Sequence, residues 1–92
     1  MKASARHILV GSESEADDLK QQLADGAEFG ALAQAHSQCP SSSRGGDLGE
    51  FGPGMMVAEF DQVVFSAPVG KVQGPVKTQF GYHLLEVTAR SE

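Results

Sequence analysis

Two histidines stand in segments whose other residues are mostly apolar. His7 lies in ARHILV and His83 lies in TQFGYHLLEV, near opposite ends of a chain of 92 residues. Both segments alternate like β-strands, in which successive side chains point to opposite faces. A neutral imidazole donates through one ring nitrogen and accepts through the other, so two such rings can satisfy each other in a dry interior. If the two strands are central neighbours in one sheet, the two histidines can meet.

Other residues that could hold a metal or a phosphate lack the partners they would need. Cys39 and His36 are spaced as the first two ligands of a zinc site, but no second pair follows that would complete four ligands. Gly45, Gly46 and Gly49 do not follow a strand in phosphate-loop spacing, and no Lys-Ser or Lys-Thr pair comes after them. We therefore expect no metal and no cofactor, and we interpret the glycines as turn residues.

Composition narrows the class of protein further. The net charge is −5, and lysine and arginine occur singly, which argues against nucleic acid as a partner. A single cysteine excludes a disulfide scaffold and favours a reducing compartment. The sequence contains no apolar run of membrane-span length and no signal-like segment. We expect one domain over residues 1–92, cytoplasmic and monomeric, although the sequence also fits a module of a larger protein.

The elements that would position the histidines follow from hydrophobic periodicity and from turn residues. The pattern predicts strands at 4–10, 47–51, 72–78 and 80–89, helices at 12–26, 28–37 and 56–67, and a loop at 38–46. Ser12 or Ser14 can cap the first helix, and Gly26 ends it. The order β-α-α-β-α-β-β favours an α+β fold, with a mainly antiparallel four-stranded sheet flanked by helices.

Five separated motifs along this chain resemble the parvulin family of peptidyl-prolyl cis/trans isomerases, in the same order and at similar spacing. They are RHILV, FGALAQAHSQCPSS, RGGDLGEFGPGMM, EFDQVVFS and GPVKTQFGYHLLEV. The chain looks most like the small, free-standing bacterial members. The resemblance implies four antiparallel strands surrounded by helices, with an active site in a cleft on the sheet.

The resemblance also implies roles for particular residues. His7 and His83 would be the paired core histidines, Thr78 would hydrogen-bond into the pair, and Cys39 would be the cleft cysteine. The proline ring of the substrate would lie in a pocket formed by Leu48, Met56 and Phe60, with Phe80 lining the cleft beside it. The histidines could support the cleft structurally or take a direct part in the chemistry.

The activity implied is rotation about X–Pro bonds in unfolded or flexible polypeptides. Cys39 could act as a nucleophile, but rotation makes no bond, so we favour a polar thiol that tunes the field at the substrate carbonyl. The segment GSESEADD stands where phosphate-directed relatives carry lysine and arginine, and its acidic residues would repel a phosphate. Val57 hints at an apolar rim, so we expect apolar residues before the proline. Two alternatives are a chaperone-like peptide-binding module with weak catalysis and, less favoured, a thiol hydrolase.

Overall fold

The protein is built around one four-stranded antiparallel sheet. The structure, a computed structural model, describes residues 2–56 and 58–91. The strands lie in the order β2-β1-β4-β3, so the first and last strands of the chain are central neighbours. Their bounds are Lys2–Val10 for β1, Asp47–Phe51 for β2, Val72–Thr78 for β3 and Gly81–Ser91 for β4. This arrangement confirms the predicted fold class, and it meets the condition under which the two histidines were expected to meet.

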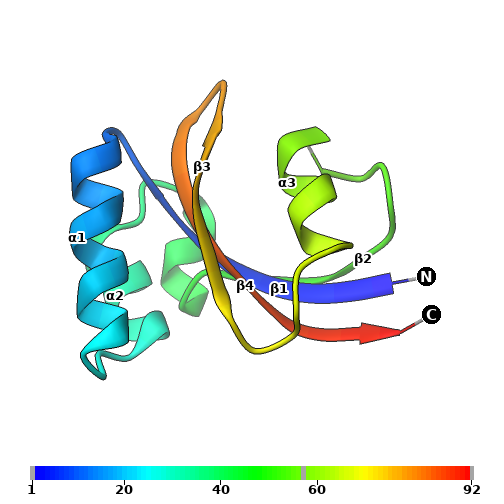
Figure 1. Ribbon diagram of the computed structural model, residues 1–92, viewed down its shortest axis with the longest axis horizontal. Coiled ribbons are helices and arrows are strands. Elements are labelled where there is room, and N and C mark those ends of the chain that lie inside the picture. The colour runs from blue at the N-terminus through cyan, green and yellow to red at the C-terminus, as the bar shows by residue number, and fades with distance from the viewer. Residues whose placement is uncertain (1, 57, 92) are drawn as a thin grey trace.

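The helices cover the two faces of the sheet unequally. Helices α1 (Glu13–Ala24) and α2 (Phe29–His36) lie on one face, and α3 (Ala58–Val64) lies on the other (Figure 1). Because side chains alternate along a strand, the sheet contributes to two hydrophobic clusters. Ala5, Leu85 and Val87 pack with Phe60 and Val64 of α3, whereas Ile8, Val10 and Leu84 pack with Leu19, Phe29 and Ala33 of α1 and α2. His7 and His83 share the face of the α3 cluster.

The start of the first helix, α1, is set by its N-terminal capping residue, Ser12. The Ser12 hydroxyl accepts a hydrogen bond from the Glu15 backbone amide at 3.2 Å, so Ser12 and not Ser14 is the cap. Ala16 and Leu19 on its inner face are buried against the sheet. No helix in the described part of the chain is long and apolar enough to cross a membrane.

Two predictions about local structure were wrong. Residues 38–46 were expected to be loop throughout, but Pro40–Arg44 form a 3-10 helix, because proline is tolerated in a first helical turn, where its missing N–H is not needed. The third helix is shorter than expected, with bounds Ala58–Val64. Val57, for which an apolar rim was predicted, lies outside the described residues.

Candidate active site

The two histidines are joined by a direct hydrogen bond. Register pairs His7 with Leu85 and Leu9 with His83, so the two imidazoles are diagonal neighbours on the same face. Their Nδ1 atoms are 3.0 Å apart. His83 Nε2 lies 2.8 Å from the Thr78 hydroxyl oxygen, which also accepts a hydrogen bond from the Phe80 backbone amide at 3.2 Å. The three side chains are buried, and they form the predicted network.

Burial keeps this pair uncharged at neutral pH. It lowers the pKa of His7 from 6.5 to about 4, and the nearby His83 adds to that effect. Burial also lowers the pKa of His83. Two neutral rings can share the Nδ1–Nδ1 bond because one supplies a proton and the other a lone pair. The pair is therefore a neutral, polar floor in an otherwise apolar surround.

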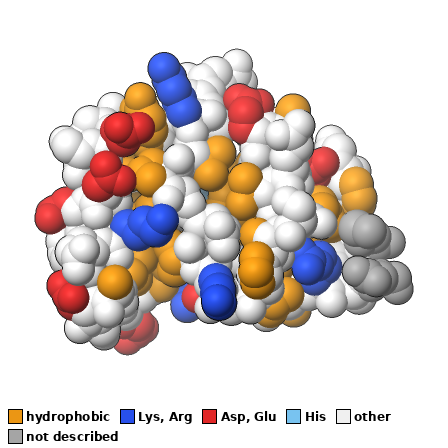
Figure 2. Space-filling model, in the orientation of Figure 1, with side chains coloured by type: hydrophobic (Ala, Val, Ile, Leu, Met, Phe, Trp, Pro, Cys, Tyr) orange, Lys and Arg blue, Asp and Glu red, His pale blue; other side chains and the backbone are white. Residues whose placement is uncertain are grey.

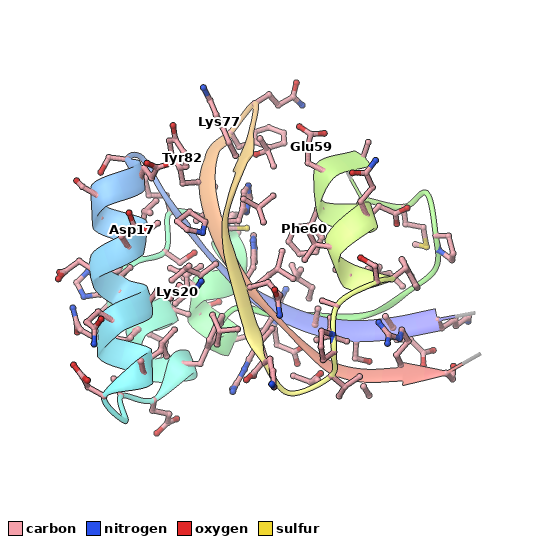
Figure 3. All side chains as sticks on the ribbon, viewed as in Figure 1. Asp17, Lys20, Glu59, Phe60, Lys77 and Tyr82 are labelled. Atoms are coloured by element: carbon pink, nitrogen blue, oxygen red, sulfur yellow. The ribbon has the colours of Figure 1, made fainter. Side chains whose placement is uncertain are left out.

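A cleft of about 360 Å³ opens above this floor on the α3 side of the sheet. It is lined by His7, Leu9, Gln38, Cys39, Pro40, Leu48, Met56, Phe60, Phe80 and His83. The ring of Phe60 stands edge-on to both imidazoles, with centroid distances of 5.7 Å to His7 and 5.9 Å to His83. Phe60 points from α3 toward the sheet (Figure 3). Phe80, at 61% exposure, lies at the rim.

The structure brings together all eight residues that the sequence singled out. Seven of them line the cleft, and Thr78 lies behind His83 as its hydrogen-bond partner. Sequence reasoning missed Leu9, Gln38 and Pro40 as cleft residues. Leu9 could have been predicted, because it is two residues after His7 on the same strand and therefore lies on the same face of the sheet.

The segment after α2 is held against β1, which places Cys39 in the cleft wall. The Gln38 amide donates to the Leu9 carbonyl at 2.8 Å, and the Leu9 amide donates to the Ser37 hydroxyl at 3.0 Å. Cys39 is a free, half-buried thiol. Its electrostatic role stays a prediction. His36 is an exposed residue at the end of α2.

The connection between α2 and β2 is also hydrogen-bonded to β1 at its far end, through the backbone of Gly46. Its carbonyl accepts the His7 amide at 3.0 Å, and its φ of +83° lies in the left-handed region that favours glycine. A Cβ on Gly46 would lie only 2.3 Å from the His7 carbonyl oxygen. The glycine is therefore what allows the loop to approach the strand that carries His7.

Comparison with known proteins agrees with this geometry. The family model that describes the rotamase (PPIC-type PPIase) domain matches residues 7–89. The chain belongs to the parvulin family. The foldase protein PrsA of a Geobacillus species is 48% identical over 92 residues, which make up 99% of this chain and 33% of that protein.

Two solved parvulin structures have the same fold. The crystal structure of the peptidylprolyl isomerase PrsA from Bacillus anthracis has a TM-score of 0.96 at 38% identity, covering 99% of this chain and 42% of that one. The solution structure of NmPin, the parvulin of Nitrosopumilus maritimus, has a TM-score of 0.87 at 39% identity, covering 96% of both chains. The chain spans about a third of the length of the PrsA relatives it matches. The free-standing state, monomeric state and cytoplasmic location stay predictions.

Proposed function

We propose that this parvulin domain catalyses cis/trans isomerisation of X–Pro bonds in unfolded or flexible polypeptides, by a non-covalent mechanism. The observation that carries the proposal is a neutral, mutually bonded histidine pair at the floor of an open, apolar cleft. A domain that only held peptides would need the cleft, but it would not need buried polar groups beneath it, because burying them costs free energy unless each is paired.

The chemistry required is modest. The barrier to rotation is about 18–20 kcal/mol, and an acceleration of roughly four decades requires a reduction of about 5.4 kcal/mol. Rotation removes the resonance of the imide, so charge leaves the carbonyl oxygen and a lone pair develops on the nitrogen. An apolar recess of Leu48, Met56 and Phe60 would hold the proline ring and remove water from the planar, more polar ground state. Polar groups of the floor and of Cys39 would face the twisting imide.

The charge distribution supports a substrate without phosphate. Within residues 2–56 and 58–91, the cleft lining includes no aspartate, glutamate, lysine or arginine. Lys77 of β3 is not part of this lining. Its ammonium lies 6.0 Å from the ring of Tyr82, and both side chains lie on the side of β3 that is toward α1 (Figure 3). Acidic side chains gather over α1 (Figure 2). We propose clients with an apolar residue before the proline, which Phe80 at the rim would contact.

Exchange spectroscopy on a short Leu-Pro peptide tests this proposal, because it measures the interconversion of the two isomers directly. We expect micromolar protein to accelerate the exchange and Met56→Ala to reduce kcat/KM by more than about tenfold, roughly 1.4 kcal/mol. Val69→Ala is the matched control, because Val69 is an exposed apolar residue outside the cleft lining.

The alternative is a peptide-binding module in which the cleft holds proline segments without catalysis. Binding of the peptide with no acceleration of exchange would leave that alternative and exclude the isomerase. Acceleration that is equal in the wild type and in Met56→Ala would show that the proline ring lies elsewhere.

A further inference from the structure

Met56 and Phe60, which both line the proposed proline recess, belong to different segments. Phe60 is on α3 and is fixed by burial, with only 3% of its surface exposed. Met56 follows the loop at 52–55, and it is only partly buried. The width of the recess therefore depends on how that loop is held relative to α3.

Apart from Pro53, whose ring fixes its own φ, the loop at 52–55 has few means of holding its own position. Gly52 and Gly54 have no side chains and the largest conformational freedom to lose on ordering. Met55 gives little packing, since 70% of its surface is exposed. The loop's internal contacts are a long backbone hydrogen bond from the Met55 amide to the Gly52 carbonyl, at 3.4 Å, and a contact from the Gly52 amide to the Met55 sulfur, at 3.2 Å.

One hydrogen bond joins this loop to α3 among the residues that the structure describes. The Gly54 amide donates to Asp61 Oδ1 at 3.1 Å, and the φ of Gly54, +84°, lies in the left-handed region that favours glycine. Asp61 directly follows Phe60 in the first turn of α3. The carboxylate thus connects the loop before Met56 to the helical turn that carries Phe60. A charged acceptor makes this bond stronger than one between neutral groups.

We propose that Asp61 is a positioning residue, which sets the separation of Met56 and Phe60 by holding the Gly54 amide. The proposal rests on the proposed isomerase function for its kinetic consequence, but not for its structural one. Gly54 is exposed, so water can replace the carboxylate when it is removed, and no buried group is left unpaired. Loss of Asp61 should therefore loosen the recess while leaving the fold nearly as stable.

Glu59 provides a matched control. It is the other acidic residue in the first turn of α3 and has the same favourable interaction with the helix dipole. It is exposed and lies at the outer end of the helix (Figure 3), and none of the described hydrogen bonds joins it to the loop. Glu59→Ala thus removes a charge from the same turn without removing the contact to Gly54.

The experiment compares the wild type with Asp61→Ala, Asp61→Asn and Glu59→Ala. We expect Asp61→Ala to raise KM for a Leu-Pro peptide by about threefold, with kcat little changed, because the loop is then in its binding position for only part of the time and the apparent affinity falls by that fraction. Asp61→Asn retains an acceptor oxygen and should restore most of the affinity. Glu59→Ala should have the kinetics of the wild type, and all three variants should have similar melting temperatures.

An NMR measurement tests the structural part independently of catalysis. The Gly54 amide should shift upfield and exchange faster in Asp61→Ala, but not in Glu59→Ala. An unchanged Gly54 amide, or a KM for Asp61→Ala equal to that of the wild type, would overturn the proposal. If the wild-type protein has no isomerase activity, the proposed function fails, and the Gly54 amide alone decides whether Asp61 holds the loop.

Discussion

The neutral histidine pair makes the stability of the fold depend on pH in a defined direction. The pKa of His7 is lowered from 6.5 to about 4 in the folded protein, so the unfolded chain takes up a proton at a higher pH than the folded chain does. The contribution of the neutral ring is complete above pH 6.5. It is lost progressively as the pH falls from 6.5 toward 4. The lowered pKa of His83 acts in the same direction.

The size of the effect follows from the pKa difference. The lowering of this pKa from 6.5 to about 4 corresponds to roughly 3 kcal/mol of stability once the ring of the unfolded chain is fully protonated and the pH is below both pKa values. Between pH 7.5 and pH 5, linkage gives a loss of about 2 kcal/mol for this one ring. That is a large part of the total stability of a small domain, which is typically about 5–15 kcal/mol.

Urea denaturation followed by circular dichroism measures this loss, since the chain has no tryptophan. Carboxylates also titrate in this range, so the comparison is between the wild type and His7→Gln. The variant should lose about 2 kcal/mol less than the wild type between pH 7.5 and pH 5. His36→Gln removes an exposed histidine and should behave like the wild type. Equal pH dependence in the wild type and His7→Gln would refute the reasoning, as would an NMR titration in which His7 protonates near pH 6.5.

Further variants test the surroundings of the pair at Thr78, Gly46 and Cys39. Thr78→Val leaves a buried ring nitrogen without its partner and should cost about 1–3 kcal/mol in urea denaturation, whereas Thr78→Ser should retain most of the stability. Gly46→Ala should cost more than about 2 kcal/mol, because its Cβ would overlap the His7 carbonyl. Gly26→Ala is the control, because Gly26 has a φ of +103° and a Cβ there would meet no atom within 4 Å, so this variant measures the cost of backbone strain alone. A larger loss of stability in Gly26→Ala than in Gly46→Ala would contradict the proposed overlap with the His7 carbonyl. Cys39→Ser should keep kcat/KM within about tenfold of the wild type; a loss of several decades would indicate a nucleophile.

Strand periodicity predicted that the two histidines could meet, on the condition that the first and last strands are neighbours in the sheet. His7 and His83 each stand on an alternating segment, and the hairpin at the end of the chain leaves β4 free to pair with β1 on its other side. Once those two strands are adjacent, period-two alternation places both rings on one face. The resemblance to parvulins was needed for Thr78, whose bond to His83 crosses a turn and has no periodic signature.

The parts that sequence reasoning missed are set by contacts between distant segments. Gln38 and Pro40 line the cleft because the connection after α2 is hydrogen-bonded to β1, at Leu9. No propensity in residues 38–46 encodes that contact. The depressed pKa values likewise come from burial under α3 and the loops, which the sequence does not quantify.

Phe60 shows why stability and function are harder to separate at some cleft residues than at others. Its ring lines the cleft, yet it is also a member of the hydrophobic cluster with Phe51 and Leu85 and the edge-on neighbour of both imidazoles. Truncating a buried phenylalanine to alanine typically costs about 3–5 kcal/mol, so a loss of activity there would not distinguish an altered recess from an unfolded domain. Met56 borders the same recess from a loop and is only partly buried, so its truncation changes the recess at a much smaller cost to the core. Substitutions at Met56, on the loop side of the recess, are therefore the ones that can change substrate preference while the domain stays folded.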